Sequence, residues 1–184
     1  MAKTVRFVAK KALFNFLGNT FRMYDSEGQL RFYIRQKAFR LKEDLRVFSD
    51  ASQDNMVLSI RARNWADARG RFDFRDAKSD AIFGGAKRNM FKSVLLDDWD
   101  LFDENDAQVG KLQECRSWTS WLRKLFRWIP QTYRVSIGEQ EVGTIRQRFN
   151  PLQLVYDIEF KADFDQRIVI STAVLMLAIE SKYD

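Results

Sequence analysis

The chain has 184 residues, 46% of them hydrophobic and 14% aromatic, which is enough to bury a full core as one domain spanning residues 1–184. It has no histidine and a single cysteine, Cys115, which excludes Ser-His-Asp catalysis, His-ligated zinc and an internal disulfide, and favours a cytoplasmic setting. No phosphate-binding loop or dinucleotide fingerprint occurs, so we predict no catalytic residues, no cofactor and no enzymatic activity.

The N-terminal segment is predicted as a strand over Thr4–Lys10. Its apolar residues also have helical spacing, but the pattern Arg6-Phe7-Val8-Ala9-Lys10 is echoed 25 positions later by Arg31-Phe32-Tyr33-Ile34-Arg35. Each copy alternates apolar with polar residues, which is typical of a strand with one buried face. Lys3, Arg6, Lys10, Lys11 and Arg22 also make this region basic, with no acidic residue before Asp25.

Turn signals separate further segments of alternating polarity, and these are predicted to form hairpins. The Asp25–Gly28 turn joins Thr20–Tyr24 to Gln29–Arg35, and the Phe102–Asp106 turn joins Val94–Phe102 to Gln108–Glu114. A third turn, around Gly138, joins Tyr133–Ile137 to Glu141–Arg148. The other predicted strands are Asp44–Ser49, Met56–Ala62, Arg71–Arg75, Ala81–Phe83 and Leu152–Phe160. Gly84 and Gly85 are interpreted as turn residues.

Between Glu114 and Glu139 the chain is basic and rich in tryptophan, with no acidic residue. If Ser117–Ile129 is helical, Trp118 and Trp121 lie on an apolar face, and Arg123, Lys124 and Arg127 lie largely opposite. This pattern is typical of a helix that binds in the plane of a membrane interface. It also fits a connection packed across a barrel end, or a surface that docks a protein partner. The candidate lipid-binding residues are Arg116, Trp118, Trp121, Arg123, Lys124, Arg127 and Trp128.

The C-terminal segment Ile168–Ser181 is apolar on every face of a helix, so protein or lipid must surround it. At ~1.5 Å per residue it is too short to cross the ~30 Å hydrocarbon core of a bilayer. A helix buried in protein is therefore predicted, and a mostly β chain surrounds one helix most simply by closing its sheet around it. Asp163 and Asp165 precede this helix and are predicted to stabilise its N-terminus, with Arg167 pairing with one of them.

The ordered series of weak motifs resembles the tubby C-terminal-like superfamily. The motifs are a Tyr24-Asp25 hairpin ending in Gly28, a strand ending in Ile34-Arg35-Gln36-Lys37, and an acidic stretch that leads into the apolar helix. Within the superfamily the chain is closest to the LURP-one-related and phospholipid-scramblase-like branch, from about Arg6 to Ser181. This resemblance implies a mainly β fold, in which a closed antiparallel barrel of about twelve strands is threaded by its hydrophobic C-terminal helix.

The resemblance also implies a non-enzymatic domain that acts at membranes. We therefore expect binding to an anionic phospholipid surface, or a scaffold role with a protein partner, in a cytoplasmic and peripheral-membrane setting. The alternative from another class is a basic nucleic-acid-binding module, which the sequence pI of about 9.5 also suits. Asp157, Glu159, Asp163 and Asp165 occupy the place of the calcium segment proposed in scramblases but lack its longer acidic alternation, so no metal site is predicted.

Overall fold

The computed structural model describes residues 3–12, 19–36, 44–63, 70–89, 98–115, 130–150 and 153–180. Within these residues, twelve strands form one closed antiparallel barrel, in which β1 pairs with β12 and every other strand pairs with its neighbours in sequence. The elements are β1 (Thr4–Ala12), β2 (Asn19–Asp25), β3 (Leu30–Gln36), β4 (Asp44–Phe48), β5 (Met56–Ala62), β6 (Arg71–Asp76), β7 (Ile82–Arg88), β8 (Asp98–Asp103), β9 (Gln108–Glu114), β10 (Thr132–Ile137), β11 (Gln140–Arg148), β12 (Gln153–Lys161) and α1 (Gln166–Glu180). The predicted barrel is confirmed.

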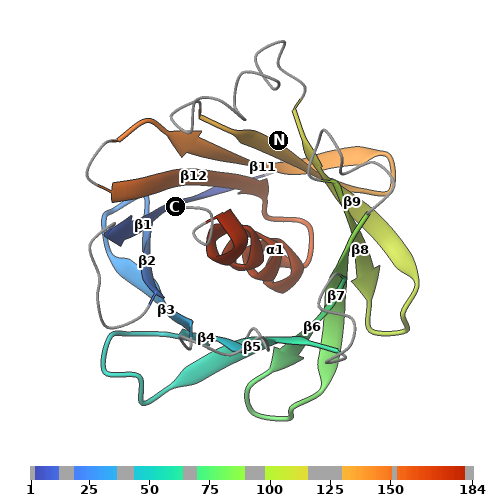
Figure 1. Cartoon of the computed structure of the whole chain (residues 1–184), viewed down its shortest axis with the longest axis horizontal. Coiled ribbons are helices and arrows are strands. Elements are labelled where there is room, and N and C mark those ends of the chain that lie inside the picture. The colour runs from blue at the N-terminus through green and yellow to red at the C-terminus, as the bar shows by residue number, and fades with distance from the viewer. Residues whose placement is uncertain are drawn as a thin grey trace.

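The helix α1 fills the barrel, as the view down the barrel in Figure 1 shows. Ala173, Val174, Leu175 and Leu177, which lie on different sides of the helix, are each at most 1% exposed. The hydroxyl of Thr172, also buried, donates to the backbone oxygen of Ile168 at 2.7 Å and so keeps its polar group satisfied within the helix. The helix is therefore the centre of the hydrophobic core, as its all-round apolar sequence predicts. Within the described residues, the structure contains no helix of the length and hydropathy needed to cross a membrane.

Alternating polarity on the strands separates a core-facing row from an outer row. On β1, Phe7 and Ala9 are buried in the core, whereas Val8 is half-buried and Lys10 exposed on the outside. Because successive side chains point to opposite faces of a strand, the register indicates which residues face outward, apart from local register shifts in β2, β4, β6, β8 and β10. The outer wall is where the polar side chains gather.

The N-terminus of α1 is capped by Asp165, one of the two aspartates predicted there, and Arg167 pairs with it as predicted. The Asp165 carboxylate accepts a hydrogen bond from the backbone N–H of Arg167 at 2.9 Å, and the Arg167 guanidinium donates to the same carboxylate at 2.9 Å. The hydrogen bond from the Arg167 side chain lowers the pKa of Asp165 below its ordinary value. The charged pair therefore fixes the point at which the chain leaves β12 and enters the barrel.

The interpretation of Gly84 and Gly85 as turn residues is wrong, because both lie inside β7. A Cβ on Gly84 would lie 2.9 Å from the backbone oxygen of Phe102 and 3.4 Å from Cγ1 of Ile168 in α1. A Cβ on Gly85 would lie 2.6 Å from the backbone oxygen of Phe72. Close packing, rather than a turn, explains the glycine pair. At β8 the strand begins at Asp98, and residues 94–97 of the predicted strand lie outside the described residues.

Candidate functional site

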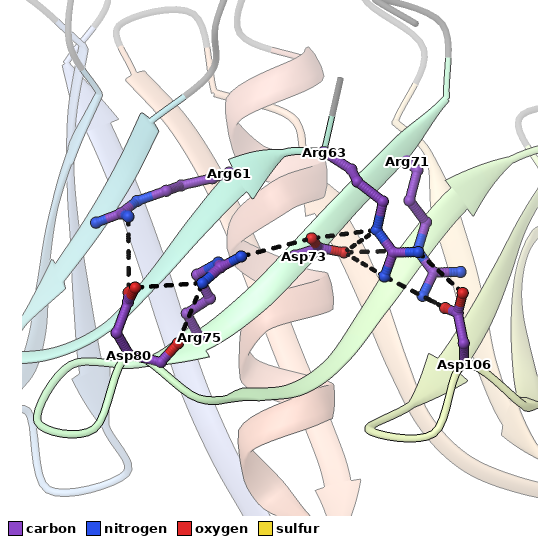
Figure 2. Close-up of polar contacts among 7 residues, drawn as sticks. All are labelled: Arg61, Arg63, Arg71, Asp73, Arg75, Asp80 and Asp106. Carbon is purple, nitrogen blue, oxygen red and sulfur yellow. Dashed lines mark hydrogen bonds and ion pairs between the residues drawn. The ribbon is translucent and has the colours of Figure 1, made fainter. Parts of the chain in front are cut away.

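An arginine–aspartate network crosses the outer wall of β5 and β6 (Figure 2). It is centred on Asp73 of β6, whose side chain is 5% exposed although it points outward. Arg63 donates from Nε to Asp73 Oδ1 at 2.9 Å, and Nε of Arg71 lies 3.7 Å from the same oxygen. On the other side, Nη2 of Arg75 approaches Asp73 Oδ2 at 4.0 Å. A nearly buried carboxylate thus organises three guanidinium groups.

Asp106, from the turn between β8 and β9, closes one side of this network. Arg63 donates from Nη1 to Asp106 Oδ2 at 2.9 Å, and Arg71 pairs with the other oxygen. The hydrogen bond from Arg63 lowers the pKa of Asp106 below its ordinary value. The Arg71 guanidinium also stacks 3.9 Å from the centre of the Phe102 ring, and a Cβ on Gly85 would lie 3.1 Å from its Nε. Arg71 is therefore fixed from several sides.

Asp80 closes the opposite side of the network. Arg75 donates from Nη1 to Asp80 Oδ2 at 3.2 Å, and Arg61 approaches Asp80 Oδ1 at 3.6 Å. Each of the four arginines in Figure 2 thus faces at least one carboxylate. The network ties the turns that follow β6 and β8 to the outer wall, and its arginines are already neutralised locally. We interpret it as a structural clamp.

The two ends of the barrel differ in charge. The connections that follow the even-numbered strands occupy residues 25–29, 49–55, 76–81, 103–107, 137–140 and 162–165, and they contain twelve Asp or Glu residues against one lysine, Lys78. In four of these turns an aspartate carboxylate accepts hydrogen bonds from backbone N–H groups two to four residues further along the chain, which stabilises the turn. The aspartates are Asp25, Asp50, Asp76 and Asp103. We call this the acidic end.

The connections that follow the odd-numbered strands have the opposite composition. Residues 13–18, 37–43, 64–69, 89–97, 115–131 and 149–152 contain nine Lys or Arg residues and three acidic residues in the sequence. Because consecutive strands are antiparallel, these segments all join strand ends at the barrel end opposite the acidic end. We call this the basic end, and α1 runs from the acidic end toward it.

A cleft of about 620 Å³ lies on the outer wall across β2, β1, β12 and the residues after β11. It extends from Asp25, Ser26 and Gly28 in a turn of the acidic end to Arg148, Phe149 and Asn150 at the basic end. Its lining includes Lys10, Tyr24, Arg148 and Phe149. The Lys10 ammonium lies 5.3 Å from the centre of the Tyr24 ring, and Arg148 pairs with the Asp157 carboxylate. Phe149 is 60% exposed, which is unusual for a large apolar side chain of a folded domain.

Three outward cations near this cleft lack a carboxylate partner among the described residues: Lys10, Arg22 and Arg146. Lys10 and Arg22 lie opposite each other on β1 and β2, and Arg146 lies opposite Asp157 on β11 and β12. Arg22 stacks 5.8 Å from the Tyr33 ring centre. In contrast to the arginines of the structural clamp, these three leave positive charge uncompensated on the outer wall.

The predicted N-terminal basic region is divided by the barrel. Arg6 faces outward but pairs with Glu159 at 3.2 Å. Lys11 faces the barrel interior, is 7% exposed and lies 5.6 Å from the Phe21 ring centre, so it is not part of the basic surface. Successive side chains of β1 point to opposite faces of the sheet, so Lys10 faces outward and its neighbour Lys11 faces inward.

The seven candidate lipid-binding residues, Arg116 to Trp128, lie outside the described residues. The strand ends on either side of them are described. The backbone N–H of Cys115 donates to the Thr132 oxygen at 2.8 Å, and the N–H of Gln147 donates to the Gln131 oxygen at 2.8 Å. Cys115 and Gln131 are therefore held against β10 and β11 at the basic end. The sequence analysis did not identify Phe149 and Arg148 as candidate site residues. An aromatic residue directly before Asn150-Pro151, a turn signal, could have indicated an exposed aromatic side chain at a strand end.

The family model for LURP-one-related proteins matches residues 5–177. The chain belongs to the LURP-one-related family. Among solved structures, the crystal structure of an Arabidopsis thaliana protein is similar over 94% of this chain and 91% of that one, with 17% sequence identity and a TM-score of 0.57. This likeness concerns the fold, a closed twelve-stranded barrel around one helix of the tubby-like type. No curated protein sequence matched the chain.

Proposed function

We propose that this LURP-one-related barrel is a non-enzymatic module that binds an anionic membrane surface through its basic end, in a cytoplasmic and peripheral-membrane setting. The observation that carries the proposal is the charge difference between the two barrel ends. A basic end attracts anionic lipid with about 1 kcal/mol for each Lys or Arg near the surface, whereas an acidic end is repelled. The polarity therefore favours one orientation of the barrel on a membrane.

Aromatic residues at the same end support the proposal. Phe149 is exposed beside Lys10 and Arg148. In the sequence, residues 116–129 contain three tryptophans, at positions 118, 121 and 128, and four basic residues with no acidic one: Arg116, Arg123, Lys124 and Arg127. Aromatic side chains are favoured at the boundary between headgroups and hydrocarbon, where basic side chains reach the lipid phosphates. The arginine–aspartate clamp lies on another part of the wall and offers no comparable excess of charge.

The test is cosedimentation with vesicles of neutral or anionic phospholipid. We expect binding to the anionic vesicles, and we expect it to weaken as salt rises because exposed charges are screened over ~8 Å at physiological ionic strength. Replacing Arg123, Lys124 and Arg127 together with glutamine should weaken binding by up to about 3 kcal/mol, the sum for three basic side chains at the surface.

The matched control replaces Lys78, Lys87 and Lys111 with glutamine. These lysines are exposed on the acidic end and on the outer wall of β7 and β9, so the net charge falls equally while the basic end is intact. Equal weakening by the two triple variants would show that net charge alone drives binding. Absence of binding to anionic vesicles would contradict the membrane proposal. Tighter binding of nucleic acid than of anionic vesicles, at the same salt concentration and the same concentration of anionic groups, would favour the nucleic-acid-binding alternative.

A further inference from the structure

The cleft beside Phe149 is a half-open hollow whose volume suits one small ligand. Its volume of about 620 Å³ lies within the range of roughly 300–1,000 Å³ found for small-molecule sites. Its floor includes Val155, which points outward from β12 but is only 6% exposed. A ligand seated over Val155 would be held from more than one side.

The register of three adjacent strands places two cations on opposite sides of this floor. Lys10 of β1 lies opposite Val155 of β12, and Val155 lies opposite Arg148 of β11. With neighbouring strands about 4.8 Å apart, the Cα atoms of Lys10 and Arg148 are separated by roughly 10 Å. Both side chains project from the same outer face, so one tetrahedral anion between them can accept hydrogen bonds from an ammonium and a guanidinium group.

The described residues that line the cleft contribute one uncompensated positive charge. Arg148 is neutralised by Asp157, although only part of its five N–H donors is used in that pair. Asp25 also lines the cleft, but its carboxylate is bound by Arg31 Nε at 2.6 Å and by two backbone N–H groups of its own turn. Lys10 is therefore the one uncompensated charge of this lining, and a single negative charge balances it. A phosphodiester has one negative charge, whereas a phosphate monoester has up to two.

Part of the cleft wall is apolar, next to polar side chains that include Ser26, Asn150 and Gln153. Phe149 at 60% exposure, the Tyr24 ring and Val8 present apolar surface to the same space. Inorganic phosphate or a fully polar phosphodiester would leave this surface unused. An amphiphile with a phosphodiester next to its apolar part would cover Phe149 and place its phosphate over Val155.

We propose that this cleft binds the phosphodiester of a single glycerophospholipid between Lys10 and Arg148, with the apolar part of the lipid against Phe149. The inference rests on the proposed membrane function and adds a site that binds one lipid molecule per protein chain. The non-specific attraction of the basic end then brings the barrel to the membrane, and the cleft holds one lipid molecule.

The experiment titrates the full chain with short-chain phosphatidylglycerol below its micelle concentration, using calorimetry or NMR shifts. We expect saturable binding of one lipid, weaker binding of the same headgroup without acyl chains, and the weakest binding of inorganic phosphate. Lys10→Gln should weaken lipid binding about fivefold, as expected for loss of one basic side chain at the surface. Phe149→Ser should weaken binding of the lipid while leaving the binding of the chain-free headgroup unchanged.

Two control variants remove a lysine and an exposed apolar side chain elsewhere on the barrel. Lys111→Gln removes an equally exposed lysine from β9, and Val57→Ser alters another exposed apolar side chain, 37% exposed on β5, so neither should change lipid binding. If phosphate binds as tightly as the lipid, or if Lys10→Gln has no more effect than Lys111→Gln, the cleft is not a lipid site. Vesicle binding without saturable monomer binding would overturn the cleft and keep the membrane function. Saturable binding of the lipid monomer without vesicle binding would keep the cleft as a lipid site and overturn the membrane function.

Discussion

At the scale of single residues, outward-facing arginines fall into two groups that the sequence alone does not distinguish. Arg63 and Arg71 are held by Asp73 and Asp106, whereas Arg22 and Arg146 have no carboxylate partner among the described residues. Asp106 is 43 residues from Arg63 and 35 from Arg71, and only the barrel brings them together. Local patterns could place each side chain on a face, but they could not show which cations are neutralised.

Asp106→Asn tests the structural clamp through the pH dependence of stability. The native pKa of Asp106 lies below its ordinary value of 3.8, so the ionised carboxylate stabilises the fold above that pH, and the contribution is lost as the pH falls through the native pKa. We expect the variant to melt at a lower temperature than the wild type near neutral pH, with the difference shrinking below pH 3.8. Asp54→Asn, in an exposed turn, is the control. A melting difference that stays constant down to strongly acidic pH would contradict the clamp.

Gly85→Ala tests the close packing under Arg71. The new Cβ would meet the Phe72 backbone oxygen at 2.6 Å, so the backbone of β6 or β7 has to shift. We expect a loss of about 1–3 kcal/mol in the free energy of unfolding, measured by chemical denaturation. Lys87→Ala, two positions along the same strand and exposed, should stay within about 0.5 kcal/mol of wild type. Equal stabilities of Gly85→Ala and wild type would show that the strand is not tightly packed there.

At the scale of elements, strands with one buried face were the most predictable part of the molecule. Met56–Ala62 and Gln108–Glu114 were predicted with the bounds that the structure has, because their alternation is regular and turn residues flank them. The strand predicted as Ala81–Phe83 extends to Arg88, since Gly84 and Gly85 suggested a turn where tertiary packing requires small residues. Propensity favours a turn at a glycine pair, and contacts from distant strands overrule it.

Leu175→Ala tests the central helix. Leu175 is 1% exposed inside the barrel, so truncation leaves a cavity that surrounding strands can only partly fill. We expect a loss of about 2–5 kcal/mol in the free energy of unfolding. Val57→Ala, on the outside of β5 and 37% exposed, serves as the control and should cost much less. An unchanged denaturation midpoint for Leu175→Ala would mean that the helix does not support the barrel.

At the scale of the whole molecule, the charge difference between the barrel ends was visible in the sequence only as separate basic and acidic stretches. The tryptophan-rich residues 116–129 and the acidic turns are interleaved along the chain. In a closed antiparallel barrel, alternate connections lie at opposite ends. Basic and acidic segments that alternate along the sequence are therefore gathered at opposite ends of the barrel, which gives the two ends opposite charge. The cleft could not be predicted because it depends on β2, β1, β12 and β11, which come from opposite ends of the chain.

Binding through the basic end fixes the orientation of the barrel on an anionic membrane, and this orientation can be measured. In a Cys115→Ser background, a fluorophore attached through Gln113→Cys marks the basic end, and one attached through Ala51→Cys marks the acidic end; both positions are exposed. Lipids with a quencher in the headgroup are then added to anionic vesicles. We predict strong quenching of the label at position 113 and little quenching at position 51. Equal quenching of the two labels, or stronger quenching at position 51, would contradict binding through the basic end.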